Sequence, residues 1–136
     1  MTQFRVNQAA ALLGVSDDTV RRWADAGRLS FVKGDNGRSL VDGTELAALA
    51  QELATDAALH AAFPASMSSA RNRITGIVTR VVKDGVMAQV DIQAGPFRVV
   101  SLISREAADD LGLEVGSLAT ASIKATNVVV EAGPRD

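Results

Sequence analysis

The chain of 136 residues contains no cysteine and a single histidine. Without cysteine it can form no disulfide framework, no thiolate metal site and no cysteine nucleophile, and its sites must use oxygen and nitrogen groups. Zinc sites gather several ligands, so the isolated His60 is better read as a surface or packing residue than as a metal ligand. The absence of cysteine also fits a reducing cytoplasm.

Long apolar runs and a strong net charge are missing as well. No stretch approaches the roughly 20 apolar residues that span a bilayer, and the start MTQFRVNQAA lacks the features of a signal peptide. We therefore expect a soluble, cytoplasmic protein. The formal net charge of −2 argues against nucleic-acid binding by charge alone. No nucleophile–base pair, carboxylate dyad or phosphate loop appears, which disfavours an enzyme.

The first half of the chain has the apolar period of helices. In VNQAAALLGVSDDTVRRWADAGRL, Asn7 is expected to cap a helix that ends at Gly14, and Ser16 to cap a second helix that ends at Gly27. Trp23 belongs to the inner stripe of the second helix, which makes it first of all a core residue. These features predict two short helices around a tight turn.

A β-hairpin and a closing helix are expected next. LSFVKGDNGRSLV has two short apolar runs around Asp35-Asn36-Gly37, which is typical hairpin-turn chemistry. DGTELAALAQELA then predicts a helix that begins near Asp42 or Thr44. Residues 55–67 continue as an alanine-rich helical extension and linker, which Pro64 interrupts.

Residues 4–54 resemble the helix-turn-helix of the mercury-resistance regulator (MerR) and phage excisionase families. The shared pattern is a short helix, Gly-Val-Ser, a recognition helix with Thr-Val-Arg, and Gly-Arg-Leu, followed by a hairpin wing. The resemblance implies duplex DNA as a partner, with the second helix in the major groove. By themselves the arginines would indicate only a solvated helix face. The implied DNA contacts are Thr19, Arg21 and Arg22 on the helix, and Lys33 and Arg38 on the wing.

The second half has the period of strands. ITGIVTRVVK, a turn at Asp84-Gly85 and VMAQVDIQ predict a hairpin, and PFRVVSLI predicts a third strand. Ser104 is expected to cap a short helix, after which LATASIKA and NVVVEA predict two last strands. We thus expect an α+β protein: a winged helix-turn-helix domain (1–54), a linker (55–67) and a five-stranded OB-like β-barrel with one short helix (68–132).

Residues 68–132 resemble the molbindin (Mop/TOBE) domain through SARN and the Ile-x-Gly strand after it, LISREAADDLGLEVG, and SIKATNVVV. The resemblance implies binding of molybdate or tungstate at an interface between subunits, and hence self-association as a dimer or larger. Molybdenum is then bound only as an oxyanion, without a metal cation or redox cofactor. The implied oxyanion-binding residues are Ser69, Arg71, Asn72, Lys124, Ala125 and Thr126, with Ser104 contributed by another subunit.

The chemistry of these residues agrees with such a ligand. A tetrahedral dianion only accepts hydrogen bonds, so its site needs convergent donors and positive charge. Without the resemblance, Arg71 and Lys124 would be ordinary surface cations. One position departs from the family, because Ala107 stands where a second serine is frequent. Two functions remain open: a molybdate- or tungstate-responsive transcriptional regulator, or a molybdate carrier or storage protein whose helical domain serves assembly.

Overall fold

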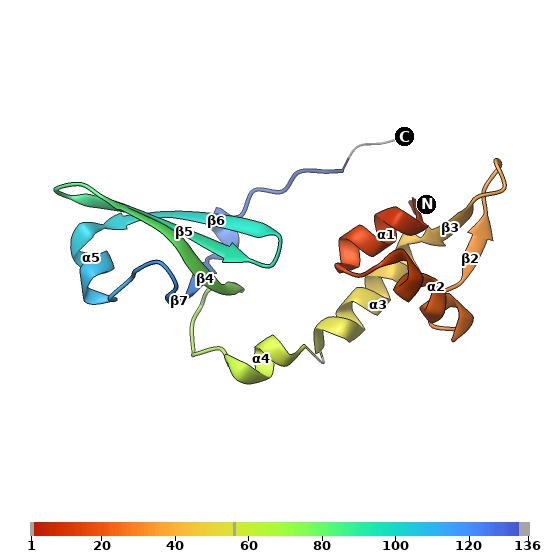
Figure 1. The fold of residues 1–136 in the computed structure, drawn as a ribbon, viewed down its shortest axis with the longest axis horizontal. Helices are drawn as coiled ribbons and strands as arrows, with labels where there is room; N and C mark the ends of the chain where they lie inside the picture. The colour runs from red at the N-terminus through yellow and green to blue at the C-terminus, as the bar shows by residue number, and fades with distance from the viewer. Residues whose placement is uncertain (1, 56, 134–136) are drawn as a thin grey trace. The chain divides into compact units, whose positions relative to one another are not determined.

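The computed structural model describes residues 2–55 and 57–133, which belong to two compact units, Met1–Ala62 and Phe63–Asp136 (Figure 1). The first unit combines helices with a small sheet, and the second is a sheet with one short α-helix. The predicted mixture of helices and strands is therefore confirmed. The boundaries at residues 54, 67 and 132 stay predictions.

The two helices of the helix-turn-helix are α1 (Val6–Leu13) and α2 (Asp17–Asp25). Gly14 ends α1 in the left-handed region with φ of 69°, and the Ser16 hydroxyl caps α2 by accepting the Thr19 N–H at 3.2 Å. The expectation that Asn7 caps α1 is wrong. Arg5 occupies the cap position in an extended conformation, because it ends a strand, and its N–H donates to Gln8 Oε1 at 2.9 Å.

That strand is β1 (Gln3–Arg5), which pairs with β3 (Ser39–Asp42), and β3 pairs in turn with β2 (Phe31–Lys33). The β2–β3 hairpin follows the prediction, and Gly37 takes the positive φ of 78° that its turn requires. Strand β1 was not predicted, because three residues are too few to show an alternating pattern.

The first unit is completed by α3 (Gly43–Thr55) and α4 (Ala58–Ala62). Trp23 packs against the core from a half-buried position, as expected, and the Arg28 guanidinium lies 5.7 Å from the centre of its ring. None of the helices in the described part of the chain has the length and apolarity to cross a membrane. The buried core residues are Val6, Ala9, Ala10, Val20, Leu29, Val41, Leu46 and Leu49.

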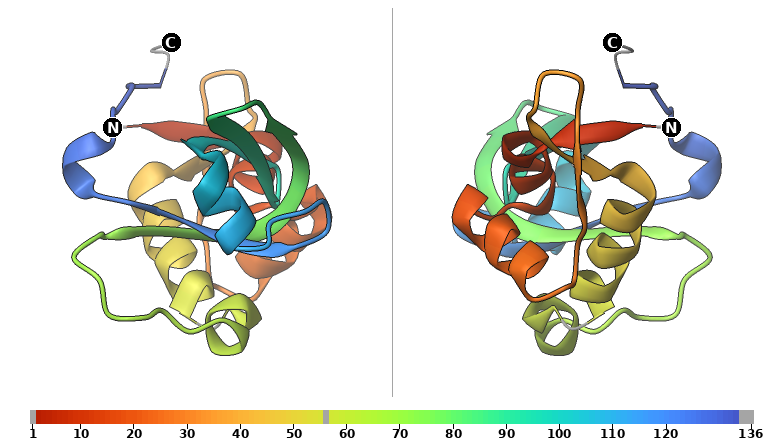
Figure 2. Two further views of the ribbon diagram at one scale, coloured as in Figure 1. Left: turned by 90° about the vertical axis from the view of Figure 1, so that its left-hand side faces the viewer. Right: turned by 90° about the vertical axis from the view of Figure 1, so that its right-hand side faces the viewer.

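The second unit is an antiparallel sheet with strand order β6-β5-β4-β7. Its elements are β4 (Asn72–Lys83), β5 (Met87–Ala94), β6 (Phe97–Ser104), α5 (Arg105–Asp110), β7 (Leu118–Ile123) and the 3₁₀ turn η1 (Ala125–Asn127). The long strand β4 curves strongly, as Figure 2 shows, and its register with β5 shifts between Val78 and Arg80. One face of the sheet buries the core around Val78, Val90 and Ile92.

The expectation of a five-stranded barrel is not met within one chain. The sheet of residues 63–133 has four strands, with β6 and β7 at its two edges. The fifth segment, 127–132, leaves β7 through η1 and pairs with no strand in the described residues. Val129 and Val130 are 89% and 85% exposed there, so the apolar pattern that predicted a strand finds nothing to pack against in a single copy.

An ion pair lies on the opposite face of the sheet. Asp91 is buried, and its carboxylate accepts a hydrogen bond from Gln89 Nε2 at 3.0 Å and from Arg98 Nη2 at 2.7 Å. These hydrogen bonds, that from Gln89 first, lower the pKa of Asp91. The charged carboxylate is therefore favoured in the folded state.

The lowered pKa predicts a pH dependence of stability. Asp91 stabilises the fold above its unfolded pKa of about 3.9, and this contribution is lost as the pH falls through the lower folded value. We expect Asp91→Asn to flatten the loss of unfolding free energy below about pH 4. Urea unfolding of both proteins between about pH 2.5 and 7 measures this. Parallel pH profiles would show that Asp84 and Asp109, whose pKa values are also lowered, carry the effect instead.

Candidate functional site

Two predicted anion-binding segments meet at one end of the sheet. Asn72, the first residue of β4, pairs with Ile123, the last residue of β7, and Asn72 Nδ2 donates to the Ile123 carbonyl at 3.1 Å. Ser69 and Arg71 immediately precede Asn72, and Lys124, Ala125 and Thr126 immediately follow Ile123. The structure thus brings the SARN and KATN segments side by side, although they are about 50 residues apart in the chain.

The SARN segment is shaped by local hydrogen bonds. The Ser68 hydroxyl accepts the Ala70 N–H at 3.1 Å, and Arg71 Nη1 lies 3.5 Å from the Ser68 carbonyl. Arg73 Nη1 donates to the Phe63 carbonyl at 2.8 Å and ties the preceding chain to the start of β4. Ser69 and Arg71 remain exposed, so the hydroxyl and the guanidinium are accessible to a ligand.

The KATN segment forms the turn η1, with Lys124 at its N-cap position. The hydrogen bonds of the turn come from the N–H groups of Asn127, to Lys124 at 2.9 Å, and Val128, to Ala125 at 3.3 Å. The first N–H groups of the turn, those of Ala125 and Thr126, are not used by it. An ammonium, two backbone N–H groups and a hydroxyl therefore lie within three consecutive exposed residues.

Ser104 lies at the other end of the sheet. It ends β6 and pairs with Met87, and the neighbouring pair Lys83–Ala88 marks the end of β4 opposite to Asn72. Because β4 has 12 residues that rise roughly 3.3 Å each, its ends are on the order of 36 Å apart along the strand. The structure does not bring Ser104 to the SARN and KATN segments of the same chain.

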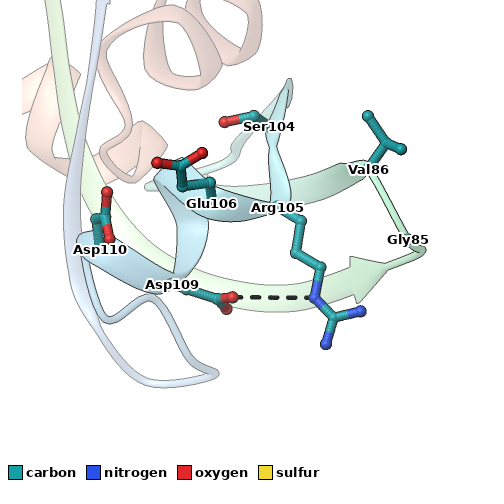
Figure 3. A pocket seen from close by; sticks show the side chains of 7 residues that line it. All are labelled: Gly85, Val86, Ser104, Arg105, Glu106, Asp109 and Asp110. Carbon is teal, nitrogen blue, oxygen red and sulfur yellow. Dashed lines mark ion pairs between the residues drawn. The ribbon is translucent and has the colours of Figure 1, made fainter.

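Ser104 opens onto a shallow hollow (Figure 3). Its hydroxyl oxygen caps α5 by accepting the Ala107 N–H at 3.0 Å, so its O–H is still able to donate to a ligand. The Ala107 N–H is engaged in this cap and does not replace the serine that the family often has there. The hollow is lined by Gly85, Val86, Ser104, Arg105, Glu106, Asp109 and Asp110.

The charge of this hollow is negative. It has three carboxylates and one guanidinium, that of Arg105, which donates to the Asp84 carbonyl and lies 3.9 Å from Asp109. Figure 3 shows the Glu106 carboxylate on the same side of the helix start as Ser104. The hydrogen bond from Lys83 lowers the pKa of Asp109, which keeps that group ionised. A dianion at Ser104 therefore needs cations from outside this hollow.

The predicted DNA-contact residues lie on several elements of the first unit, and only some of their side chains contact one another. Thr19 Oγ1 accepts a hydrogen bond from Arg22 Nη2 at 3.0 Å, so these two side chains are engaged with each other. Arg21 is exposed on α2, Lys33 ends β2, and Arg38 follows the turn of the hairpin.

A second hollow brings part of this set together. It is lined by Arg5, Val6, Asn7, Asp17, Arg21, Phe31, Arg38 and Ser39. Of the predicted DNA contacts, Arg21 and Arg38 line it, whereas Thr19, Arg22 and Lys33 do not. Arg5 was not predicted as a contact, because its place in this hollow depends on the unpredicted strand β1.

Comparison with known proteins finds two families. The family model of the TOBE domain matches residues 68–130, and that of a helix-turn-helix domain matches residues 4–54, which confirms both resemblances. Molybdenum-pterin-binding protein 3 of Clostridium pasteurianum is 43% identical over 63 residues, which cover 46% of this chain and 93% of that protein. A probable molybdenum-pterin-binding protein of Haemophilus influenzae is 44% identical over 63 residues, covering 46% and 91%. A solved molybdate binding protein from Sporomusa ovata is 31% identical with a TM-score of 0.48, covering 49% of this chain and all of that one.

Proposed function

The chain belongs, through its TOBE domain, to the family of molybdenum-pterin-binding proteins, and on that premise we propose that it is a transcriptional regulator whose DNA binding responds to molybdate or tungstate. The observation that carries the proposal is the Asn72–Ile123 pairing, which gathers anion donors in a chain that also has a helix-turn-helix domain. Neither matched family is enzymatic, and the proposal includes no reaction.

The donors of the SARN and KATN segments suit a tetrahedral oxyanion. Ser69, Thr126 and two backbone N–H groups offer neutral hydrogen bonds, and Arg71 and Lys124 add two positive charges that match the two negative charges of molybdate. Asn72 uses its amide to hold the two segments together, so its part in binding is to order the site.

A second copy of the chain completes the proposed site with its Ser104. The distance along β4 prevents one chain from joining Ser104 to Lys124, and the negative hollow at Ser104 lacks the cations that the other end of the sheet exposes. Apolar side chains exposed in the second unit support self-association, because burying them is favourable. They include Ile77, Val100, Leu102, Leu118, Val129 and Val130.

In a dimer or larger assembly, the anion can control the relative placement of two helix-turn-helix units. The two half-sites that a dimer binds on DNA lie one helical turn, about 34 Å, or a multiple of it apart. The affinity for duplex DNA therefore depends on how the assembly spaces its two helix-turn-helix units. A ligand held between subunits alters that geometry, and therefore the affinity, if it favours one arrangement over another.

The test combines anion and DNA titrations. In phosphate-free buffer, we expect molybdate and tungstate to bind and sulfate to bind far more weakly in calorimetric titrations. Molybdate at 100 times its dissociation constant raises the unfolding free energy by about 2.7 kcal/mol. Selection from random duplexes should recover a preferred sequence, and molybdate should change its gel-shift midpoint.

Both the DNA-binding and the anion-binding part of the proposal can be contradicted by this test. Anion binding without any preferred duplex would instead support a molybdate carrier or storage protein. No thermal shift at millimolar molybdate would refute the anion site.

A further inference from the structure

The arginines of the first unit differ in whether their guanidinium groups form ion pairs or hydrogen bonds within the protein. Arg28 forms an ion pair with Glu52 at 3.1 Å, and Arg22 is hydrogen-bonded to Thr19. Arg5, Arg21 and Arg38, by contrast, make no ion pair within residues 2–55 and 57–133, and all three are exposed. Their charges remain available to an external anion.

These three arginines line one hollow although they come from different elements. Arg5 ends β1 directly before α1, Arg21 is on α2, and Arg38 is on the β2–β3 hairpin. Asp17 is the one carboxylate among the lining residues, so the hollow has a formal charge of +2. Its lining also includes Val6 and Asn7, the first two residues of α1, whose N–H groups have no acceptor within that helix.

We propose that this hollow binds a single backbone phosphate of duplex DNA and that Arg5 is one of the contacts. This site rests on the proposed function, and it specifies where the DNA backbone contacts the first unit. Helix-turn-helix proteins place the second helix in the major groove while the first crosses the backbone. The start of α1 next to α2 is therefore where a phosphate at the groove edge lies. Guanidinium groups bind phosphate through paired N–H donors, which fits an arginine cluster.

The first test substitutes Arg5. Arg5→Ala is expected to weaken binding to a mixed-sequence duplex by about tenfold and to reduce the slope of log affinity against log salt by about one. Arg28→Ala is the matched control, because it removes the same charge from a guanidinium already paired with Glu52 and should leave the slope unchanged. Fluorescence anisotropy across salt concentrations measures both, and an unchanged urea transition of Trp23 fluorescence shows that the first unit of Arg5→Ala is folded.

The second test uses the carboxylate in the hollow. Asp17→Asn removes a negative charge that opposes the phosphate and should raise duplex affinity by about two- to fivefold. Asp18→Asn, one residue further along α2 and outside the lining, should raise it less. If the unaltered protein binds no duplex at low salt, the proposed function itself is overturned. If it binds, but Arg5→Ala behaves like Arg28→Ala or Asp17→Asn like Asp18→Asn, only the phosphate site is overturned.

Discussion

Lys124→Ala is expected to weaken molybdate binding by about one to two orders of magnitude. Lys124 lies at the N-cap of η1, directly after the residue that pairs with Asn72. In the proposed site its ammonium binds the same anion as Arg71. A charge-assisted hydrogen bond contributes about 1.5–3 kcal/mol, which is more than a neutral one. Ser69→Ala should therefore cost less affinity than Lys124→Ala.

Two further variants test the charge of Lys124 and the contribution of the second copy. Lys124→Gln restores a donor without the positive charge and should recover little affinity. Ser104→Ala tests the contribution of the second copy and should weaken binding by about as much as Ser69→Ala, since each removes one neutral donor. Lys124→Ala, Lys124→Gln and Ser69→Ala should unfold at the same temperature as the parent without ligand, because both side chains are exposed. Ser104→Ala should unfold at a lower temperature, because it removes the cap that accepts the Ala107 N–H, a loss that commonly costs about 0.5–2 kcal/mol. A molybdate titration of Lys124→Ala that matches the parent would place the anion elsewhere.

Short-range chemistry explains why much of the first unit was predictable. Ser16 caps α2, Gly14 and Gly37 take positive φ, and the hairpin forms around Asn36, each as the local sequence requires. These preferences act over a few residues and are visible in the sequence. The pairing of β1 with β3 is not local, and for that reason neither the Arg5 cap nor the arginine hollow could be predicted.

In the second unit, the features that could not be predicted depend on pairing between distant segments. The apolar run Val128–Val130 has the composition of a strand, but a strand needs a neighbour, and none is found for it in one described copy. The donor residues near Asn72 were named from resemblance alone. Their proximity follows from the register of β4 with β7, which no local pattern encodes.

Gly76→Ala is expected to unfold or severely destabilise the second unit. Gly76 is the glycine of the Ile-x-Gly strand, and a Cβ added there would lie 2.3 Å from the Gln93 carbonyl oxygen and 2.9 Å from Ile92 Cγ2. The nearer contact is with backbone, so relief requires β4 to move away from β5. Overpacking commonly costs about 1–3 kcal/mol, and a backbone contact this close predicts the upper end or more.

The chain offers a control for this substitution and a fluorescence probe that reports the first unit alone. Gly85→Ala adds the same methyl group where nothing lies within 4 Å and should change stability by less than about 0.5 kcal/mol. Trp23 is the only tryptophan and lies in the first unit, so its fluorescence reports that unit, whereas far-UV circular dichroism reports both. In urea, Gly76→Ala should lower the circular dichroism midpoint and leave the tryptophan transition in place.

Anion binding should fail together with the sheet in Gly76→Ala. Gly76 pairs with Ala119 in the same β4–β7 ladder that joins Asn72 to Ile123, so displacement of β4 at residue 76 disturbs the register that brings SARN to KATN. Lys124→Ala, in contrast, should weaken anion binding and keep the fold. If Gly76→Ala retained the urea midpoint of Gly85→Ala, β4 and β5 could separate locally at little cost, and the close approach at Gln93 would not be needed for the site.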